Sequence, residues 1–98
     1  MRKSAVITGS TSGIGKAVAE SLAASGVNIM LNGFGDAEEI EAQRADLEQK
    51  YGVTARYNGA DMTNGSEIRA LIDATKSELG NVDIVVNNAG IQHVCPID

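Results

Sequence analysis

Short runs of apolar residues alternate along this chain with longer stretches in which apolar residues recur every three or four positions. A nearly continuous apolar run is typical of a strand covered on both faces, and the longer period is typical of an amphipathic helix. Four runs are predicted to be strands, at residues 5–8, 27–31, 53–57 and 82–86. The alternation indicates repeated β-α-β units and therefore an α/β fold.

The first stretch between predicted strands carries its apolar residues at a spacing of four. Ile14, Val18 and Leu22 therefore share one side of a predicted helix. Gly26 is expected to end this helix, because glycine readily adopts the left-handed conformation that closes many helices.

The two later helices are predicted to have similar signals at both ends. Asp36 and Asn64 each precede a glutamate by three positions, which is the spacing of a capping box. Gly52 and Gly80 follow the last apolar positions and are expected to end these helices. The apolar positions are Ile40 and Leu47 in the second helix and Ile68, Leu71, Ile72 and Leu79 in the third.

Right-handed crossovers between parallel strands predict one sheet of order 3-2-1-4, with two helices on one face and the third on the other. The expected fold class is α/β, a Rossmann-type doubly wound parallel sheet, of which the chain has the first four strands and three helices. The fourth strand lies at an edge of this sheet although it is very apolar, and proteins seldom leave such an edge bare. We therefore expect residues 1–98 to be the N-terminal part of a single, larger domain.

Composition and charge mainly exclude function classes. Hydrophobic residues make up 43% of the 98 and charged residues 21%, as in an ordinary globular protein. The net charge is -5 without a cluster of lysines or arginines, so neither nucleic acid nor an acidic membrane is an expected partner. No apolar stretch has the length of a signal or membrane segment, and the single Cys95 allows no internal disulfide. We expect a cytoplasmic protein.

Candidate chemistry begins at TGSTSGIG, residues 8–15, directly after the first predicted strand. The glycines are Gly9, Gly13 and Gly15, and the hydroxyl residues between the first two are Ser10, Thr11 and Ser12. Glycines permit a tight turn into a helix whose free amides and dipole attract an anion, to which the hydroxyls can add donors. A glycine-rich connection without a ligand is the alternative, but the place of the turn in a β-α-β unit favours a dinucleotide. A P-loop is excluded, because Lys16 is followed by alanine.

The charges favour NAD over NADP as the cofactor. Dinucleotide sites of this kind usually have an acidic residue about 20 positions after the glycines, and here Gly33 stands at the end of the second strand. Asp36 lies close by but is better explained as a helix cap. No lysine or arginine lies between residues 17 and 43 to bind a ribose 2′-phosphate, and Asp36, Glu38 and Glu39 would repel it.

TGSTSGIG, Asp61 after the third strand and NNAG at residues 87–90 after the fourth occur in the order of the predicted elements. This set resembles the short-chain dehydrogenase/reductase family, and the resemblance spans almost the whole chain. It implies that the chain is the NAD-binding part of an oxidoreductase. The positions assigned to the cofactor by the resemblance are Gly9, Thr11, Ser12, Gly13, Ile14, Gly15, Phe34, Asp61, Met62, Asn88, Ala89 and Gly90.

In that resemblance Phe34 lies beside the adenosine ribose, Asp61 accepts a hydrogen bond from the adenine amino group, and NNAG brings the backbone against the cofactor. From the residues alone, the preferred interpretation of Asp61 is a turn residue before the third helix, and NNAG can be a turn that ends a strand.

The stretches LNGFGDAEEIE and NNAGIQH resemble the branch of the family that oxidises D-3-hydroxybutyrate to acetoacetate in ketone body metabolism. The resemblance implies that Gln92 helps to hold the substrate carboxylate, and Gln92 follows a strand on the ligand side of the predicted sheet. A solvated loop residue is the alternative. His93 and Cys95 have no partners in the sequence that would indicate a metal or a reactive thiol, so we expect no metal site.

The family carries out its acid and base chemistry with a tyrosine, a lysine and a serine, which the resemblance places beyond position 98. Tyr51 and Tyr57 do not replace them, because neither is followed by a lysine four positions later. We expect no catalytic residue within the chain, no activity from it alone, and a homotetramer for the complete enzyme. Two alternatives stay open: another substrate of the same family, and a non-catalytic nucleotide-binding module.

Overall fold

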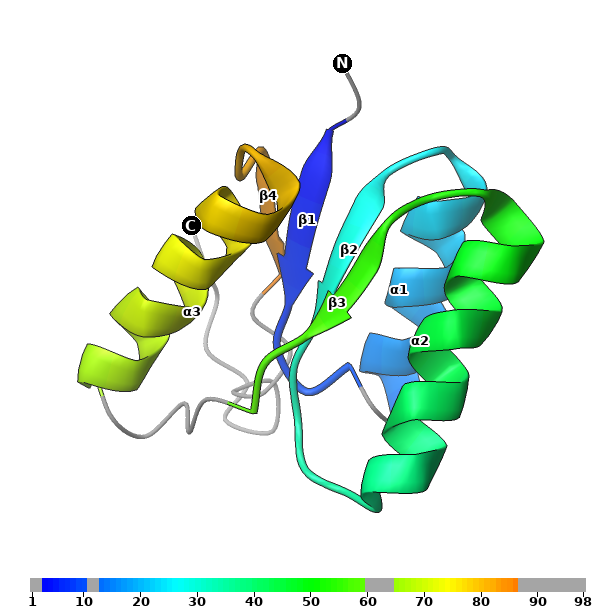
Figure 1. Cartoon of the computed structure of the whole chain (residues 1–98), viewed down its shortest axis with the longest axis horizontal. Helices are drawn as coiled ribbons and strands as arrows, with labels where there is room; N and C mark the ends of the chain where they lie inside the picture. Colours follow the sequence, from blue (N-terminus) through cyan, green and yellow to red (C-terminus); the bar gives the residue numbers. More distant parts are fainter. Residues whose placement is uncertain (1–2, 11–12, 60–64, 87–98) are drawn as a thin grey trace.

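The computed structural model describes residues 3–10, 13–59 and 65–86. They form a parallel sheet of order β3-β2-β1-β4 between two layers of helices (Figure 1). The strands are β1 (Ser4–Ile7), β2 (Asn28–Leu31), β3 (Ala55–Tyr57) and β4 (Ile84–Val86), and the helices are α1 (Gly13–Ala24), α2 (Ala37–Tyr51) and α3 (Gly65–Leu79). The predicted fold class and strand order are confirmed.

The central strands β1 and β2 are buried, as the continuous apolar runs predicted. In the parallel register Ala5 lies opposite both Ile29 of β2 and Ile84 of β4. At the edge, β4 pairs with β1 alone among the described strands, and the Val85 side chain is 57% exposed. The predicted position of the fourth strand at an edge is therefore confirmed.

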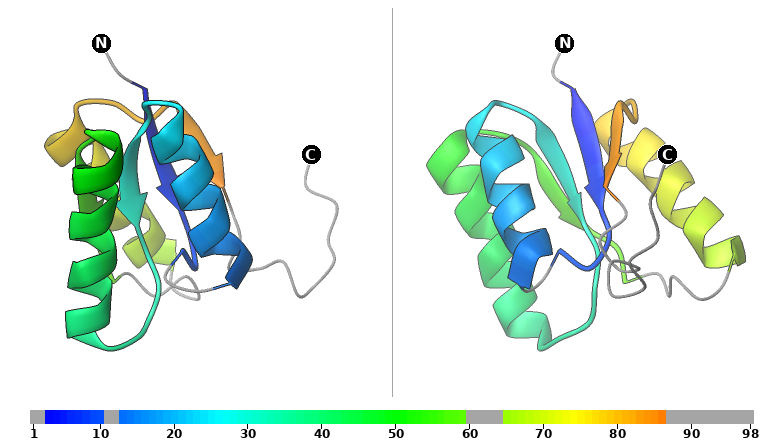
Figure 2. Two further views of the ribbon diagram at one scale, coloured as in Figure 1. Left: turned by 90° about the vertical axis from the view of Figure 1, so that its right-hand side faces the viewer. Right: turned by 180° about the vertical axis from the view of Figure 1, so that it is seen from behind.

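Helices α1 and α2 cover one face of the sheet, and α3 covers the other (Figure 2). Helix α1 approaches the sheet through a row of small residues, because Gly15, Ala19 and Ala23 are its buried positions. The row predicted from the apolar spacing precedes these buried residues by one position. In that row Ile14 is 62% exposed, and Val18 and Leu22 are partly buried beside the core. Small side chains let the helix backbone lie close to the sheet, and the larger side chains flank the contact.

The predicted C-terminal ends of the helices and the predicted N-cap of α2 are confirmed, whereas Asn64, expected before α3, lies outside the described residues. Gly26, Gly52 and Gly80 all have positive φ angles, and the Gly52 amide donates to the Glu48 carbonyl at 3.0 Å. Asp36 precedes α2 in an extended conformation, and its carboxylate accepts a hydrogen bond from the Glu38 amide at 3.4 Å. Asp36 is therefore the N-cap of α2.

The outer edge of β3 is covered by side chains of α2. The Ala55 amide donates to the Glu48 carboxylate at 2.9 Å, and the Ala55 carbonyl accepts from the Arg44 guanidinium at 3.0 Å. Arg56 also reaches the Glu48 carboxylate, at 3.0 Å. The backbone groups of Ala55 that would otherwise be open to another strand are thus occupied.

Candidate functional site

The carboxyl ends of β1, β2 and β3 point to the same edge of the sheet (Figure 1). The strand order reverses at β1, since β2 and β3 lie on one side of it and β4 on the other. Open α/β sheets bind their ligands outside the carboxyl ends of the strands at such a reversal. The turn from β1 into α1 and the segment after β2 both lie at this position.

The turn from β1 into α1 contains two glycines in the left-handed conformation, Gly9 at φ 63° and Gly13 at φ 61°. A Cβ atom on Gly13 would meet no heavy atom within 4 Å, so the position demands glycine for its backbone angle and not for lack of space. Helix α1 begins at Gly13 and has no acidic residue in its first turn. Its first amides and the positive end of its dipole are therefore free of a carboxylate from the same turn, which suits an anionic ligand.

Ser10 and Asn32 connect this turn to the end of β2. The Ser10 amide donates to the Asn32 carbonyl at 2.6 Å, and the Asn32 amide donates to the Ser10 hydroxyl oxygen at 2.9 Å. Both residues are buried, with 0% and 1% of their surface exposed. The prediction that the Ser10 hydroxyl adds a donor for a ligand is wrong, because this hydroxyl lies inside the protein and is bonded to Asn32.

The Asn32 side chain also bonds to the residues that follow β1 and β3. Its Oδ1 accepts a hydrogen bond from the Gly9 amide at 3.3 Å, and its Nδ2 donates to the Asn58 carbonyl at 3.0 Å. Gly9 follows β1 and Asn58 follows β3, so one side chain joins the ends of three neighbouring strands. The sequence analysis missed Asn32, and the signal available there was a lone amide residue directly after a buried strand.

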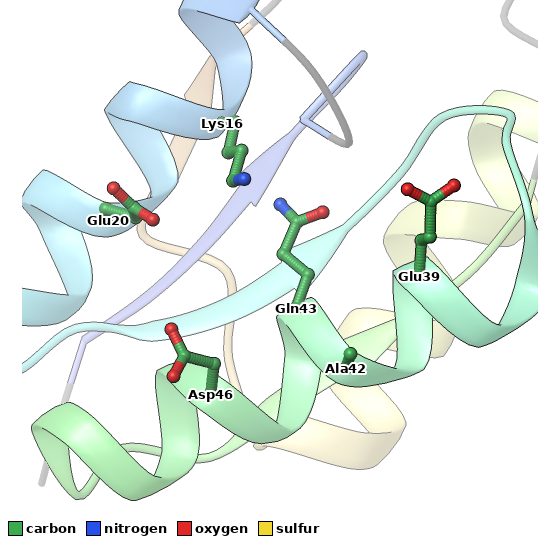
Figure 3. Close-up of a pocket in the computed structure, with 6 residues that line it drawn as sticks. All are labelled: Lys16, Glu20, Glu39, Ala42, Gln43 and Asp46. Carbon is green, nitrogen blue, oxygen red and sulfur yellow. The ribbon is translucent and has the colours of Figure 1, made fainter.

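Gln43 of α2 holds the same turn from the other side. Its Nε2 donates to the Ser10 carbonyl at 2.8 Å. Gln43 also lines a cleft of about 450 Å³ between α1 and α2, where Lys16 and Gln43 point toward one another (Figure 3). The other residues that line this cleft are Glu20, Glu39, Ala42 and Asp46.

The segment from β2 to α2 presents Phe34 to solvent, with 73% of its surface exposed. The Gly33 carbonyl before it accepts a hydrogen bond from the Tyr57 hydroxyl of β3. Gly33 itself has a φ of 143°, which favours glycine, and Asp36 is used as the helix cap. The predicted contact of Phe34 with a ribose stays a prediction.

Five of the residues assigned to the cofactor lie at this edge of the sheet: Gly9, Gly13, Ile14, Gly15 and Phe34. Gly15 is buried against the sheet, where it supports helix packing, and Ile14 is exposed at the start of α1. The remaining predicted site residues lie outside the described residues; they are Thr11, Ser12, Asp61, Met62, Asn88, Ala89, Gly90 and Gln92. His93 and Cys95 lie outside them as well.

Within residues 3–10, 13–59 and 65–86, no group of three histidine, cysteine or acidic side chains is arranged to hold a metal ion. No helix in that part of the chain has the length and apolar character needed to cross a membrane.

The sequence matches the family model of short chain dehydrogenases over residues 3–98. The D-beta-hydroxybutyrate dehydrogenase of Cupriavidus necator is 50% identical over 96 residues, which are 98% of this chain and 36% of that protein. The enzyme of the same name from Rhizobium meliloti is 47% identical over 98 residues, which are 100% of this chain and 38% of that protein. The chain thus spans little more than a third of the length of these relatives.

Other relatives have different substrates in their names. The 3-oxoacyl-[acyl-carrier-protein] reductase FabG of Staphylococcus epidermidis is 38% identical over 91 residues, which are 93% of this chain and 37% of that protein. Among solved structures, the L-sorbose reductase of Gluconobacter frateurii complexed with NADPH and L-sorbose has a TM-score of 0.81 at 37% identity. That match covers 91% of this chain and 34% of the reductase.

Proposed function

Because the chain belongs to the short-chain dehydrogenase family, we propose that it is the NAD-binding part of an enzyme that oxidises D-3-hydroxybutyrate to acetoacetate. The observation that carries the proposal is the left-handed glycine turn from β1 into α1, which opens at the strand reversal of the sheet. The substrate is inferred from the two hydroxybutyrate dehydrogenases with 50% and 47% identity.

The described residues fit a dinucleotide at this turn. The first amides of α1 would bind the pyrophosphate, and the open space at Gly13 leaves room for it against the backbone. The Gly9 and Ser10 amides are already bonded to Asn32, so among the described residues the donors for the anion would come from the start of the helix. When bound, NAD supplies the hydride acceptor, and the chain holds and orients it.

Charge supports NAD rather than NADP. Exposed Asp36, Glu38 and Glu39 lie at the start of α2, directly after the segment where the adenosine ribose is expected. Arg44, the first cation after them, is bonded to the carboxylates of Glu41 and Glu48 at 2.6 and 2.9 Å. A 2′-phosphate would therefore meet carboxylates at this position, and its binding would be opposed.

The other assignments belong to the same proposal. Thr11, Ser12, Asp61, Met62 and the Asn88–Gly90 segment would complete the NAD site. Gln92 would hold the substrate carboxylate. The catalytic tyrosine, lysine and serine would come from outside this chain, and the complete cytoplasmic enzyme would be a homotetramer.

A second candidate keeps the cofactor site and changes the substrate. The 3-oxoacyl reductases at 38% identity favour an acyl-carrier-bound ketone as that substrate. A non-catalytic nucleotide-binding module is the third possibility, since similarity of fold does not confer activity.

A substrate screen of the full-length natural protein tests the proposal. D-3-hydroxybutyrate with NAD is expected to give the highest kcat/KM, measured by the absorbance of the reduced nicotinamide, with L-3-hydroxybutyrate as the stereochemical control. A preference for an acyl-carrier-bound ketone would favour the second candidate, and NAD binding without turnover of any substrate would favour the third.

A further inference from the structure

The amide side chain of Asn32 has the two hydrogen-bonding functions that its position requires. The Gly9 amide is a donor and needs an acceptor, whereas the Asn58 carbonyl is an acceptor and needs a donor. A carboxylate of the same size would satisfy only the first, and an aliphatic side chain would satisfy neither. Because Asn32 is 1% exposed, water does not replace a missing partner there without rearrangement.

Gln43 constrains the same turn from a different element. Asn32 bonds to the amide of Gly9, and Gln43 bonds to the carbonyl of Ser10, the next residue. One contact comes from the end of β2 and the other from α2, so the backbone after β1 is held at two successive residues.

We infer that Asn32 and Gln43 are positioning residues for the cofactor, an inference that rests on the proposed function. They hold Gly9 and Ser10 so that the chain enters Gly13 and the start of α1 in the conformation that binds the pyrophosphate. Asn32 acts through the turn, because its own polar atoms are bonded to Gly9 and Asn58 inside the protein. A turn that is held before the cofactor arrives loses less conformational entropy when it binds.

The chain offers a matched control for each residue. Asn28 lies on the same strand as Asn32, and its side chain also bonds to the β3 side of the sheet, accepting from the Thr54 amide at 2.9 Å. Asn28 is at the amino end of β2, away from the turn. Gln49 is an exposed residue of α2, the helix that carries Gln43.

The test compares Asn32→Ala with Asn28→Ala, and Gln43→Met with Gln49→Met, in the full-length protein. Asn32→Ala is expected to weaken NAD binding by about ten-fold, because it removes two hydrogen bonds of the side chain. Gln43→Met removes one hydrogen bond and is expected to weaken NAD binding by about five-fold. Both controls are expected to stay within about two-fold, although Asn28→Ala also lowers the melting temperature. Where turnover is measured, KM for NAD is expected to rise while kcat stays nearly unchanged.

Amide hydrogen exchange without NAD gives a second readout. The Gly9 and Ser10 amides are expected to exchange faster in Asn32→Ala and Gln43→Met than in either control. If Asn32→Ala does not fold, the Gln43→Met comparison decides the question, because Gln43 is only half-buried. Unchanged affinity and exchange in Gln43→Met would overturn the inference, and so would an affinity loss in Asn28→Ala equal to that in Asn32→Ala. If the unsubstituted protein binds no NAD, the proposed function fails and the inference fails with it.

Discussion

Ser10 and Asn32 are joined by three hydrogen bonds of 2.6 to 3.2 Å, which connect the residues that follow two neighbouring strands. Two of these bonds use the Ser10 hydroxyl, and both residues are buried. The pair therefore fixes the turn after β1 against the end of β2.

Replacement of Ser10 by alanine is expected to destabilise the protein by about 1 to 2 kcal/mol, because the Asn32 amide loses its buried acceptor. Urea unfolding measures the loss. Ser25→Ala is the control, since the Ser25 hydroxyl bonds to the Ser21 carbonyl at an exposed position. Equal stability of the two variants would show that the Ser10 bonds contribute nothing.

Gly13→Ala is expected to weaken NAD binding more than it destabilises the fold. The strain of an alanine at φ 61° costs about 1 kcal/mol, and the added methyl group projects into the space where the pyrophosphate is expected. Gly52→Ala imposes similar strain at φ 70°, also without a neighbour within 4 Å, but at the end of α2. Thermal melts are expected to give similar melting temperatures for the two variants. Calorimetric titration is expected to show a loss of NAD affinity in Gly13→Ala and not in Gly52→Ala.

Asp36→Ser is expected to improve NADP binding by about two- to five-fold while NAD binding stays the same. Serine keeps a capping oxygen for α2 and removes one carboxylate from the region where the 2′-phosphate is expected. Asp46→Ser is a control near the other end of α2, where it removes a carboxylate from the same helix. A change of NADP affinity that is equal in both variants would indicate a general charge effect.

Glu48→Gln is expected to destabilise the protein by about 1 kcal/mol at pH 7. The hydrogen bond from the Ala55 amide, followed by the contacts with Arg44, lowers the pKa of Glu48 below its ordinary value of 4.5. The stabilisation is therefore complete well above pH 4.5 and is lost as the pH falls through the lower pKa of the folded state.

The difference in unfolding free energy between Glu48→Gln and the unsubstituted protein should accordingly shrink in acid. Unfolding in urea at pH 7 and at several values below pH 4.5 measures it. Glu41→Gln is the comparison: the hydrogen bond from Arg44 lowers the pKa of Glu41 as well, but Glu41 is 64% exposed, so a smaller difference of the same sign is expected. A difference that grows in acid would contradict the assigned pKa direction.

The sequence predicted the order of the elements because the strands are short apolar runs and because α1 and α3 carry apolar residues at helical spacing. In α2 the apolar spacing is weak, and Asp36 and Gly52 at its two ends carried the prediction. It predicted strand ends less well. Val27 and Val53 are buried although they precede the paired residues of β2 and β3, so the apolar runs extend beyond the strands. The predicted buried row of α1 was also one position away from the observed row. Glycine and alanine form the observed row, and they are buried without a strong hydropathy signal.

The sequence predicted the glycine turn of the candidate site but not the hydrogen bonds that hold this turn in place. Gly9 and Gly13 carry a local signal, because a strand that turns tightly into a helix needs their backbone angles. The bonds from Asn32 and Gln43 join residues 23 and 33 positions apart, and no local pattern encodes such pairs. They become visible only when the sheet and α2 bring these side chains to the turn.

A crystal structure of the full-length protein with NAD bound tests most directly whether the turn from β1 into α1 holds the cofactor. We expect the pyrophosphate oxygens to accept hydrogen bonds from the amides at the start of α1, with the Ser10 hydroxyl still bonded to Asn32. Electron density for NAD in the cleft between α1 and α2, or elsewhere away from Gly9 and Gly13, would contradict this assignment.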